Sequence, residues 1–187
     1  MSPAPGSIYL VRHGEAEASW GQSPDPGLSQ LGGEQAETAA QRLAGLVGEG
    51  ATLVSSPLQR ARETARPLAG ALGLELRIDE RFREIPSPVP LEERQNWLRS
   101  FMAGQWSGQD DGLVAWRGDI LRALTELPPQ TVVFTHFLVI NTVVGHLQGR
   151  DDTLVFWPAN ASITQLEQTG TDLRLLSLGE EMDTHVN

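Results

Sequence analysis

Hydrophobic residues in this chain fall into short contiguous runs that alternate with longer amphipathic segments. Runs of four or five apolar residues are typical of strands buried on both faces, as in a parallel sheet. The segments between them repeat apolar residues at intervals of three and four, which indicates helices with one buried face. The pattern predicts strands at Ser7–Arg12, Thr52–Ser56, Leu74–Ile78, Thr131–Thr135, Ser162–Glu167 and Leu173–Leu178.

Helices are predicted between these strands, and local signals mark their ends. The first runs from Ser29, a favourable N-cap residue, to about Val47. The second has Ser56 as N-cap, Pro57 at the first helical position and Gly73 as its terminator. Further helices are expected at Leu91–Met102, Leu113–Leu127 and Leu138–Leu147. This alternation predicts an α/β fold, a three-layer sandwich whose mostly parallel central sheet of about six strands is flanked by helices.

Length and composition narrow the classes of protein to consider. With 187 residues, we expect one domain over residues 1–187. Lys and Arg number 14 against 24 Asp and Glu, which gives a net charge of −10. This balance argues against a nucleic-acid partner, because binding to a phosphate backbone requires a basic surface. The chain has no cysteine, so disulfides, thiolate nucleophiles and Cys-ligated metals are excluded.

The N-terminal segment MSPAPGS has neither the basic nor the apolar region of a secretory signal. No apolar run in the sequence is long enough to span a bilayer. We therefore expect a cytoplasmic protein with no membrane partner. The sequence makes no prediction of its oligomeric state.

Basic and polar residues stand at the carboxyl ends of three predicted strands. The first strand ends in Arg12-His13-Gly14, and the fourth leads into His136. The second ends in Ser55-Ser56 and opens the helix that carries Arg60. Ligands of open α/β sheets bind beyond the carboxyl ends of the strands, so we expect these residues to converge. Arginine forks and the N–H groups of a helix N-terminus suit phosphoryl oxygens, and Gly14 would let the backbone approach such a ligand without a Cβ.

A histidine in such a pocket offers more than binding. Its neutral ring is a nucleophile near pH 7, and attack on phosphorus would produce a phosphohistidine. A second, protonated histidine would stabilise charge on the transferring oxygens. The leaving alkoxide then needs a proton from a carboxylic acid of raised pKa, for which Asp79, Glu80 and Glu84 are candidates after the third strand.

These motifs, in this order, resemble the histidine phosphatase superfamily of phosphoglycerate-mutase-like proteins, whose hallmark is Arg-His-Gly at the end of the first strand. The segment SSPLQRARETA is similar to the family signature Ser-x-Leu-x-Arg-Ala-x-x-Thr-Ala, with Arg60 at the phosphate-binding arginine. Further matches are DPGLSQLGGEQA, VVFTH and NASITQLE, so the resemblance covers nearly the whole chain.

The resemblance implies a role for each matching residue. His13 is the nucleophile that becomes phosphorylated, and Glu84 is the proton donor. Arg12, Arg60 and His136 complete the phosphate pocket. The family needs no metal and no other cofactor, so the expected activity is hydrolysis of a small phosphomonoester through phospho-His13.

The chain also departs from the family pattern. Ala16 and Ser19 stand where threonine and asparagine are frequent, so some phosphate contacts are expected to be missing or replaced. Ile85-Pro86-Ser87-Pro88 follows Glu84 in place of a Gly-x-Trp-Glu-Gly-like segment, which weakens the register that makes Glu84 the acid. Phe137 replaces a frequent glycine and is expected to narrow the pocket or mark a different substrate.

Other activities remain open at this stage. A phosphoglycerate-mutase-type phosphoryl transferase is the sister hypothesis, although the short region before Leu113 favours hydrolysis. A non-catalytic phosphate-binding or interaction protein would explain the departures at Ala16 and Ser19. A phosphohistidine protein phosphatase suits the net charge less well. A metal hydrolase is disfavoured, because the two histidines lie far apart in the sequence without short-range ligand spacing.

Overall fold

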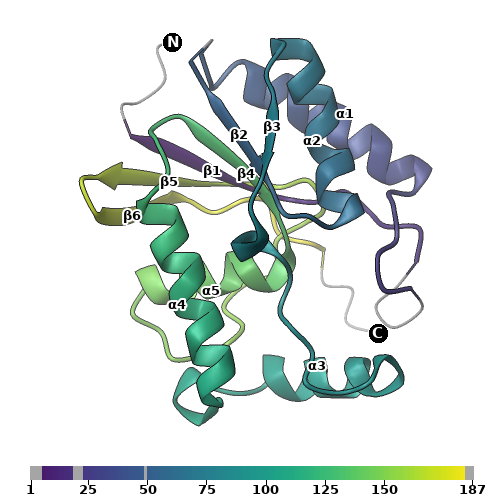
Figure 1. The fold of residues 1–187 in the computed structure, drawn as a ribbon, viewed down its shortest axis with the longest axis vertical. Coiled ribbons are helices and arrows are strands. Elements are labelled where there is room, and N and C mark those ends of the chain that lie inside the picture. The colour runs from purple at the N-terminus through teal and green to yellow at the C-terminus, as the bar shows by residue number, and fades with distance from the viewer. Residues whose placement is uncertain (1–5, 19–22, 49, 184–187) are drawn as a thin grey trace.

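The computed structural model describes residues 6–18, 23–48 and 50–183. A six-stranded mixed sheet runs through its centre in the order β3-β2-β4-β1-β5-β6 (Figure 1). Neighbours among β1 to β4 are parallel, and β5 pairs antiparallel with both β1 and β6. The strands are β1 (Ser7–Arg12), β2 (Thr52–Ser55), β3 (Leu76–Ile78), β4 (Thr131–Thr135), β5 (Ile163–Thr169) and β6 (Asp172–Ser177).

Helices cover both faces of the sheet, which Figure 1 shows passing between the pair α1 and α2 and the pair α4 and α5. The helices are α1 (Gln30–Ala44), α2 (Gln59–Leu72), α3 (Arg94–Met102), α4 (Asp111–Thr125) and α5 (Phe137–Leu147). This arrangement confirms the predicted α/β fold with its largely parallel sheet. No helix among residues 6–18, 23–48 and 50–183 has the length and apolarity to cross a membrane.

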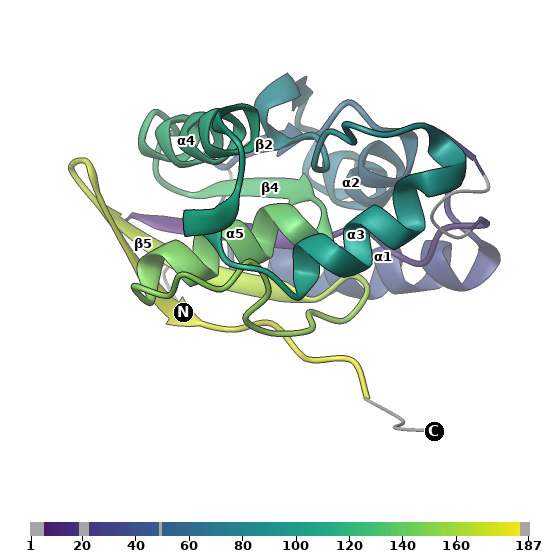
Figure 2. The same cartoon turned by 90° about the horizontal axis from the view of Figure 1, so that it is seen from below.

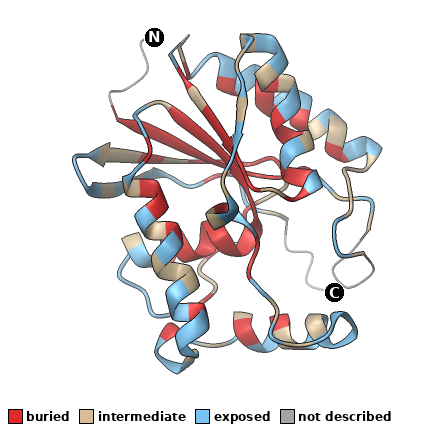
Figure 3. Cartoon of the chain, viewed as in Figure 1, coloured by how far each residue is buried: buried red, intermediate tan, exposed pale blue. Residues whose placement is uncertain are grey.

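Contiguous apolar runs in β1 and β4 are buried along their whole length (Figure 3). Successive side chains alternate between the two faces, since Ile8 and Leu10 pack with α4 and α5 while Tyr9 and Val11 pack with α1 and α2. Two cores therefore form, one on each face. This explains why the strand sequences are apolar throughout rather than alternating.

A third apolar cluster joins α3 to α5. Helix α3 lies at the lower end of the molecule in Figure 1 and toward the viewer in Figure 2. Leu98 and Phe101 of α3 pack with Ile85, Trp106 and Phe137. The cluster therefore fixes the segment after Glu84 and the start of α3 beside the carboxyl edge of the sheet.

Several element boundaries differ from the sequence prediction. Helix α2 begins at Gln59 with Leu58 as its N-cap, so the prediction of Ser56 as N-cap and Pro57 at the first helical position is wrong. The Ser56 hydroxyl accepts from the Leu58 amide and contacts His136, which makes it part of the site rather than of the helix. Short 3-10 turns at Glu80–Phe82 and Trp106–Gly108 were not predicted, and Leu91–Glu93, predicted as the start of a helix, forms a 3-10 turn before α3.

Candidate active site

Parallel pairing of β1 with β4 brings the two histidines together. The register sets Arg12 opposite Thr135, and the His13 amide donates to the Thr135 carbonyl at 3.0 Å. His13 and His136 follow these two strand ends, and their ring centroids are 5.3 Å apart with the planes inclined at 59°. The carboxyl edge of the sheet thus places the histidines in contact although the chain separates them widely.

His13 is held in one tautomer by its neighbours. Its Nδ1 lies 2.7 Å from the Gly14 carbonyl oxygen, which can only accept, so Nδ1 carries the proton. Its Nε2 accepts a hydrogen bond from Arg60 Nε at 3.1 Å, so the lone pair of Nε2 points toward the arginine. Burial, followed by the charges of Arg60 and Arg12, holds the pKa of His13 well below 6.5. The ring is therefore neutral at neutral pH.

Two buried arginines flank His13. Arg60 projects from the first turn of α2 and Arg12 ends β1, and the two residues are 6% and 8% exposed. Arg12 Nη1 donates to the Pro158 carbonyl at 2.7 Å, and its guanidinium carbon lies 5.1 Å from the ring centroid of Phe137. Burial lowers the pKa of Arg12 to about 10, so this arginine stays charged at neutral pH. Two cations without a carboxylate ion pair among the described residues make a pocket for an anion.

His136 is the N-cap residue of α5 and is fully buried. Its Nε2 lies 2.6 Å from the Ser56 hydroxyl, while its Nδ1 has no hydrogen-bond partner among the described residues. Burial is the largest cause that lowers the pKa of His136 well below 6.5, and the charge of Arg60 adds to it. A bound phosphoryl dianion would supply both a partner for the ring and the negative charge that favours its protonated form.

Glu84 is buried against the N-terminus of α5. Its Oε1 accepts from the Ile85 amide at 3.0 Å, and its Oε2 accepts from the Leu138 amide at 3.3 Å. Only 7% of the residue is exposed, and burial raises the pKa of its carboxyl group above 4.5. The carboxyl group is therefore held in one place and retains its proton to a higher pH than an exposed glutamate does.

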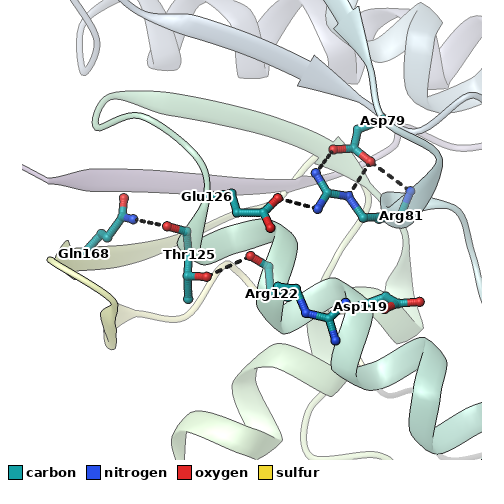
Figure 4. Close-up of polar contacts among 7 residues, drawn as sticks. All are labelled: Asp79, Arg81, Asp119, Arg122, Thr125, Glu126 and Gln168. Carbon is teal, nitrogen blue, oxygen red and sulfur yellow. Dashed lines mark hydrogen bonds and ion pairs between the residues drawn. The ribbon is translucent and has the colours of Figure 1, made fainter.

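An ion-pair network fixes the turn that delivers Glu84 (Figure 4). Arg81 Nη2 lies 2.7 Å from Asp79 Oδ2, and Arg81 Nη1 lies 2.5 Å from Glu126 Oε2 at the end of α4. The Thr135 hydroxyl donates to the Phe82 carbonyl at 2.8 Å. The turn of residues 80–82 is thereby tied to α4 and to β4, two residues before Glu84.

A cavity of about 500 Å³ opens in front of His13, Arg12 and Arg60. Glu84 and His136 do not line it, and both are buried. Gly14 does not line it either. A Cβ on Gly14 would lie 2.5 Å from the Gly32 carbonyl oxygen, so this glycine is needed for packing against the start of α1. The other lining residues are Glu15, Ala16, Ala18, Ser23, Pro24, Pro26, Arg94, Gln95 and Asn160.

The three residues that depart from the family pattern, Ala16, Phe137 and Ser19, differ in where they lie relative to the cavity. Ala16 lines the cavity and supplies no polar side chain there. Phe137 is buried, lies under Arg12, and packs against Trp157 with ring centroids 5.3 Å apart, so its ring does not line the cavity. Ser19 lies outside the described residues.

Asn160 and Arg94 are two of the lining residues that the sequence analysis did not assign to the site. Asn160 donates from Nδ2 to the His13 carbonyl at 3.2 Å, and it stands at the start of NASITQLE, where its polar side chain before a buried strand was the available signal. Arg94 reaches the cavity from α3, and no local pattern distinguishes it from the surface arginines. Residues 6–18, 23–48 and 50–183 contain no group of three His, Cys, Asp or Glu side chains that could hold a metal ion.

Paired histidines and two buried arginines lie at the carboxyl edge of the parallel strands, where α/β proteins bind ligands, and their donors suit an anion such as a phosphoryl group. Residues 8–181 match the sequence model of the histidine phosphatase superfamily, branch 1. The chain therefore belongs to the histidine phosphatase superfamily.

Individual relatives agree with this assignment. The probable phosphoglycerate mutase GpmB of Yersinia pestis is 36% identical over 111 residues, which are 52% of this chain and 50% of that protein. The matched region thus spans about half the length of such curated relatives. The phosphoserine phosphatase of Entamoeba histolytica, solved with 3-phosphoglyceric acid, has a TM-score of 0.73 and 25% identity over 93% of this chain and 96% of its own. The mycobacterial glucosyl-3-phosphoglycerate phosphatase shares the fold, with a TM-score of 0.69 and 23% identity over 94% and 99% of the two chains.

Proposed function

We propose that this protein is a metal-independent phosphatase that hydrolyses a small phosphomonoester through a phosphohistidine on His13. The observation that carries the proposal is the state of the His13 ring. The Gly14 carbonyl holds the proton on Nδ1, and burial beside two arginines keeps Nε2 unprotonated. A neutral imidazole with an unprotonated nitrogen in an anion pocket is the arrangement that nucleophilic catalysis requires.

In the first step, His13 Nε2 attacks phosphorus and the bond from phosphorus to the ester oxygen breaks. Arg60 moves its Nε–H donor from His13 to a phosphoryl oxygen, and Arg12 and His136 donate to the others. Glu84 gives its proton to the leaving alkoxide, which departs as an alcohol. The raised pKa of Glu84 keeps that proton available.

In the second step, water attacks the phosphorus of phospho-His13. The Glu84 carboxylate left by the first step accepts the proton of this water. The bond from phosphorus to Nε2 breaks, inorganic phosphate leaves, and His13 and protonated Glu84 return to their starting states.

A phosphoglycerate mutase activity is the second candidate, favoured by the relative of 36% identity that carries this name. In a mutase the phosphoryl group passes from His13 to another hydroxyl of a sugar acid instead of to water. Chromatography of the products of a phosphoglycerate separates the two activities, because a phosphatase releases inorganic phosphate and a mutase releases an isomer.

The test is hydrolysis of p-nitrophenyl phosphate in excess EDTA by the intact protein and by His13→Ala. We expect turnover that resists EDTA and disappears with His13→Ala. His146→Ala is the matched control, because His146 is exposed on α5 and outside the cavity. Quench of the intact protein with labelled substrate in detergent at alkaline pH should trap a phosphoenzyme that survives in base and loses its label in acid. Turnover that survives His13→Ala or is lost with EDTA would contradict the mechanism.

A further inference from the structure

Arg12, the arginine at the end of β1, has a methionine among its hydrogen-bond acceptors. Its Nη1 lies 2.7 Å from the Pro158 carbonyl oxygen and 3.3 Å from Met182 Sδ. These two acceptors occupy the N–H groups of Nη1 and leave the donors of Nη2 and Nε for a ligand. A thioether is a weak acceptor, so it orients the guanidinium without competing strongly with an anion.

Backbone hydrogen bonds hold Met182 in this position. The Met182 amide donates to the Trp157 carbonyl at 2.8 Å, and the Ala159 amide donates to the Glu180 carbonyl at 2.7 Å. The segment of residues 180–182 therefore runs alongside residues 157–159. The sulfur is placed against the guanidinium by the backbone of two neighbouring segments and not by side-chain packing alone.

The sulfur lies where solvent, an apolar cluster and a cation meet. The contact between Arg12 and Met182 is only partly buried. Met182 also packs against the apolar cluster of α3 and α5, which includes Phe137 and Leu138. A small oxidant can therefore reach the sulfur from solvent, and a polar atom added to it would meet both the apolar cluster and the guanidinium.

The chain offers an oxidant few other reactive side chains. It has no cysteine and three methionines, at positions 1, 102 and 182. Met102 lies on α3 and packs against the same apolar cluster. Among residues 6–18, 23–48 and 50–183, Met182 is the methionine whose sulfur accepts a hydrogen bond from an arginine of the pocket.

We propose that Met182 is a site of reversible oxidation, at which hydrogen peroxide forms a sulfoxide that weakens the binding of a phosphoryl group by Arg12. The sulfur lone pair attacks one peroxide oxygen, and the S–O bond forms as the O–O bond breaks. The other oxygen leaves as water with both protons, so the sulfur is oxidised and the peroxide is reduced. The proposal rests on the proposed function, because it assigns Arg12 to the phosphoryl group.

A sulfoxide differs from a thioether in two properties that affect Arg12. Its oxygen is polar and accepts hydrogen bonds well, so it competes with phosphoryl oxygens for the guanidinium. It is also unfavourable against the apolar cluster, which displaces the side chain that orients Nη1. Loss of one hydrogen bond from a charged donor corresponds to about 10- to 100-fold in affinity.

The test measures the Kd of inorganic phosphate by calorimetry before and after treatment of the intact protein with hydrogen peroxide. We expect peptide mass spectrometry to find the sulfoxide at Met182 and the Kd to rise about 10- to 100-fold. Methionine sulfoxide reductases should remove the oxygen and restore the Kd, which damage to the fold would not allow. No sulfoxide at Met182, or a sulfoxide there with an unchanged Kd, would refute the proposal.

Three variants assign the effect to this sulfur. Met182→Leu keeps a side chain of similar size without an oxidisable atom, so peroxide should not change its Kd for phosphate. Met102→Leu is the matched control and should lose affinity on oxidation as the intact protein does. Met182→Gln places an amide oxygen near the guanidinium and should bind phosphate more weakly than Met182→Leu without any oxidant. Peroxide sensitivity that persists in Met182→Leu would contradict the assignment.

Phosphate binding separates this proposal from the proposed function. If the intact protein binds phosphate but hydrolyses no phosphomonoester, the phosphatase is refuted and the change in Kd on oxidation still tests Met182. If the intact protein hydrolyses its substrate and its Kd for phosphate is the same with Met182 oxidised or reduced, only the oxidation site is refuted. Failure of the intact protein to bind phosphate would overturn both proposals.

Discussion

Replacement of Glu84 by glutamine tests the proton donor directly. The amide cannot give a proton to an alkoxide, and proton transfer by a positioned acid contributes about 10²- to 10⁴-fold. Leaving groups differ in their need for that proton, because p-nitrophenolate is a far weaker base than an alkoxide. We therefore expect Glu84→Gln to slow phosphorylation of His13 by about 10²- to 10⁴-fold with an alkyl phosphate and by less than about tenfold with p-nitrophenyl phosphate.

The structure indicates that this loss would not reflect unfolding. Glutamine keeps one oxygen to accept from the Ile85 amide, and the Leu138 amide, now 3.3 Å from Glu84 Oε2, loses its acceptor. An unsatisfied buried donor costs about 1–3 kcal/mol. The substitution also removes a buried group whose raised pKa opposes stability: the contribution of Glu84 is most favourable below pH 4.5 and falls as pH rises through its folded-state pKa. Urea titrations should therefore show that the free energy of unfolding of Glu84→Gln, relative to that of the intact protein, increases as the pH rises above 4.5.

A rapid-quench measurement of the first turnover is the appropriate assay, because Glu84 also acts in the later attack by water. Glu80→Gln is the control, since Glu80 is an exposed carboxylate on the same turn and pairs with Arg83. The intact protein should also lose its first-turnover rate on the alkyl phosphate as pH rises through the pKa of Glu84, and the glutamine variant should not. Equal losses with both leaving groups would refute the assignment of Glu84 as the acid.

Three further predictions concern the scaffold of the site. Gly32→Ala should lower the free energy of unfolding by about 1–3 kcal/mol, because its Cβ would lie 2.0 Å from the Glu15 carbonyl oxygen. Gly33→Ala places its Cβ in open space and should raise the free energy of unfolding by up to about 1 kcal/mol. Urea titrations that rank the two variants otherwise would contradict the packing argument. Arg81→Met should lower kcat more than it changes KM, because it removes the ion pairs that fix the turn before Glu84. The variant should also shift the alkaline limb of the pH profile of kcat. An unchanged pH profile would show that these ion pairs do not contribute to catalysis. Phe137→Ala should cost about 3–5 kcal/mol in urea denaturation, and a cost below about 1 kcal/mol would show that this buried ring is dispensable.

Pattern alone predicted the order of strands and helices, but it was less accurate about their ends. The strand Thr131–Thr135 has the same bounds in the structure, because each of its residues is buried and the apolar run has no ambiguity. The start of α2 was misplaced because Ser56 and Pro57 carry the local signals of a helix N-terminus. The Ser56 hydroxyl lies instead against His136, a residue 80 positions away, and no local rule includes that contact.

The sequence by itself determined that basic residues gather at one edge of a parallel sheet. Parallel strands carry their carboxyl ends to the same edge, so Arg12, His13 and His136 were expected at that edge. The pairing of β1 with β4, which places the two histidines side by side, came from the structure. The resemblance to the family supplied the register for Arg60 and Glu84.

Only the tertiary structure decided the chemical state of these groups. The tautomer of His13 depends on a carbonyl 2.7 Å from Nδ1, and the raised pKa of Glu84 depends on burial under α5, a helix 54 positions further along the chain. His136 keeps a buried Nδ1 without a hydrogen-bond partner in the described chain, beside the ring of His13. Burial, tautomer and unsatisfied donors arise from contacts between distant segments, and a linear pattern does not contain those contacts.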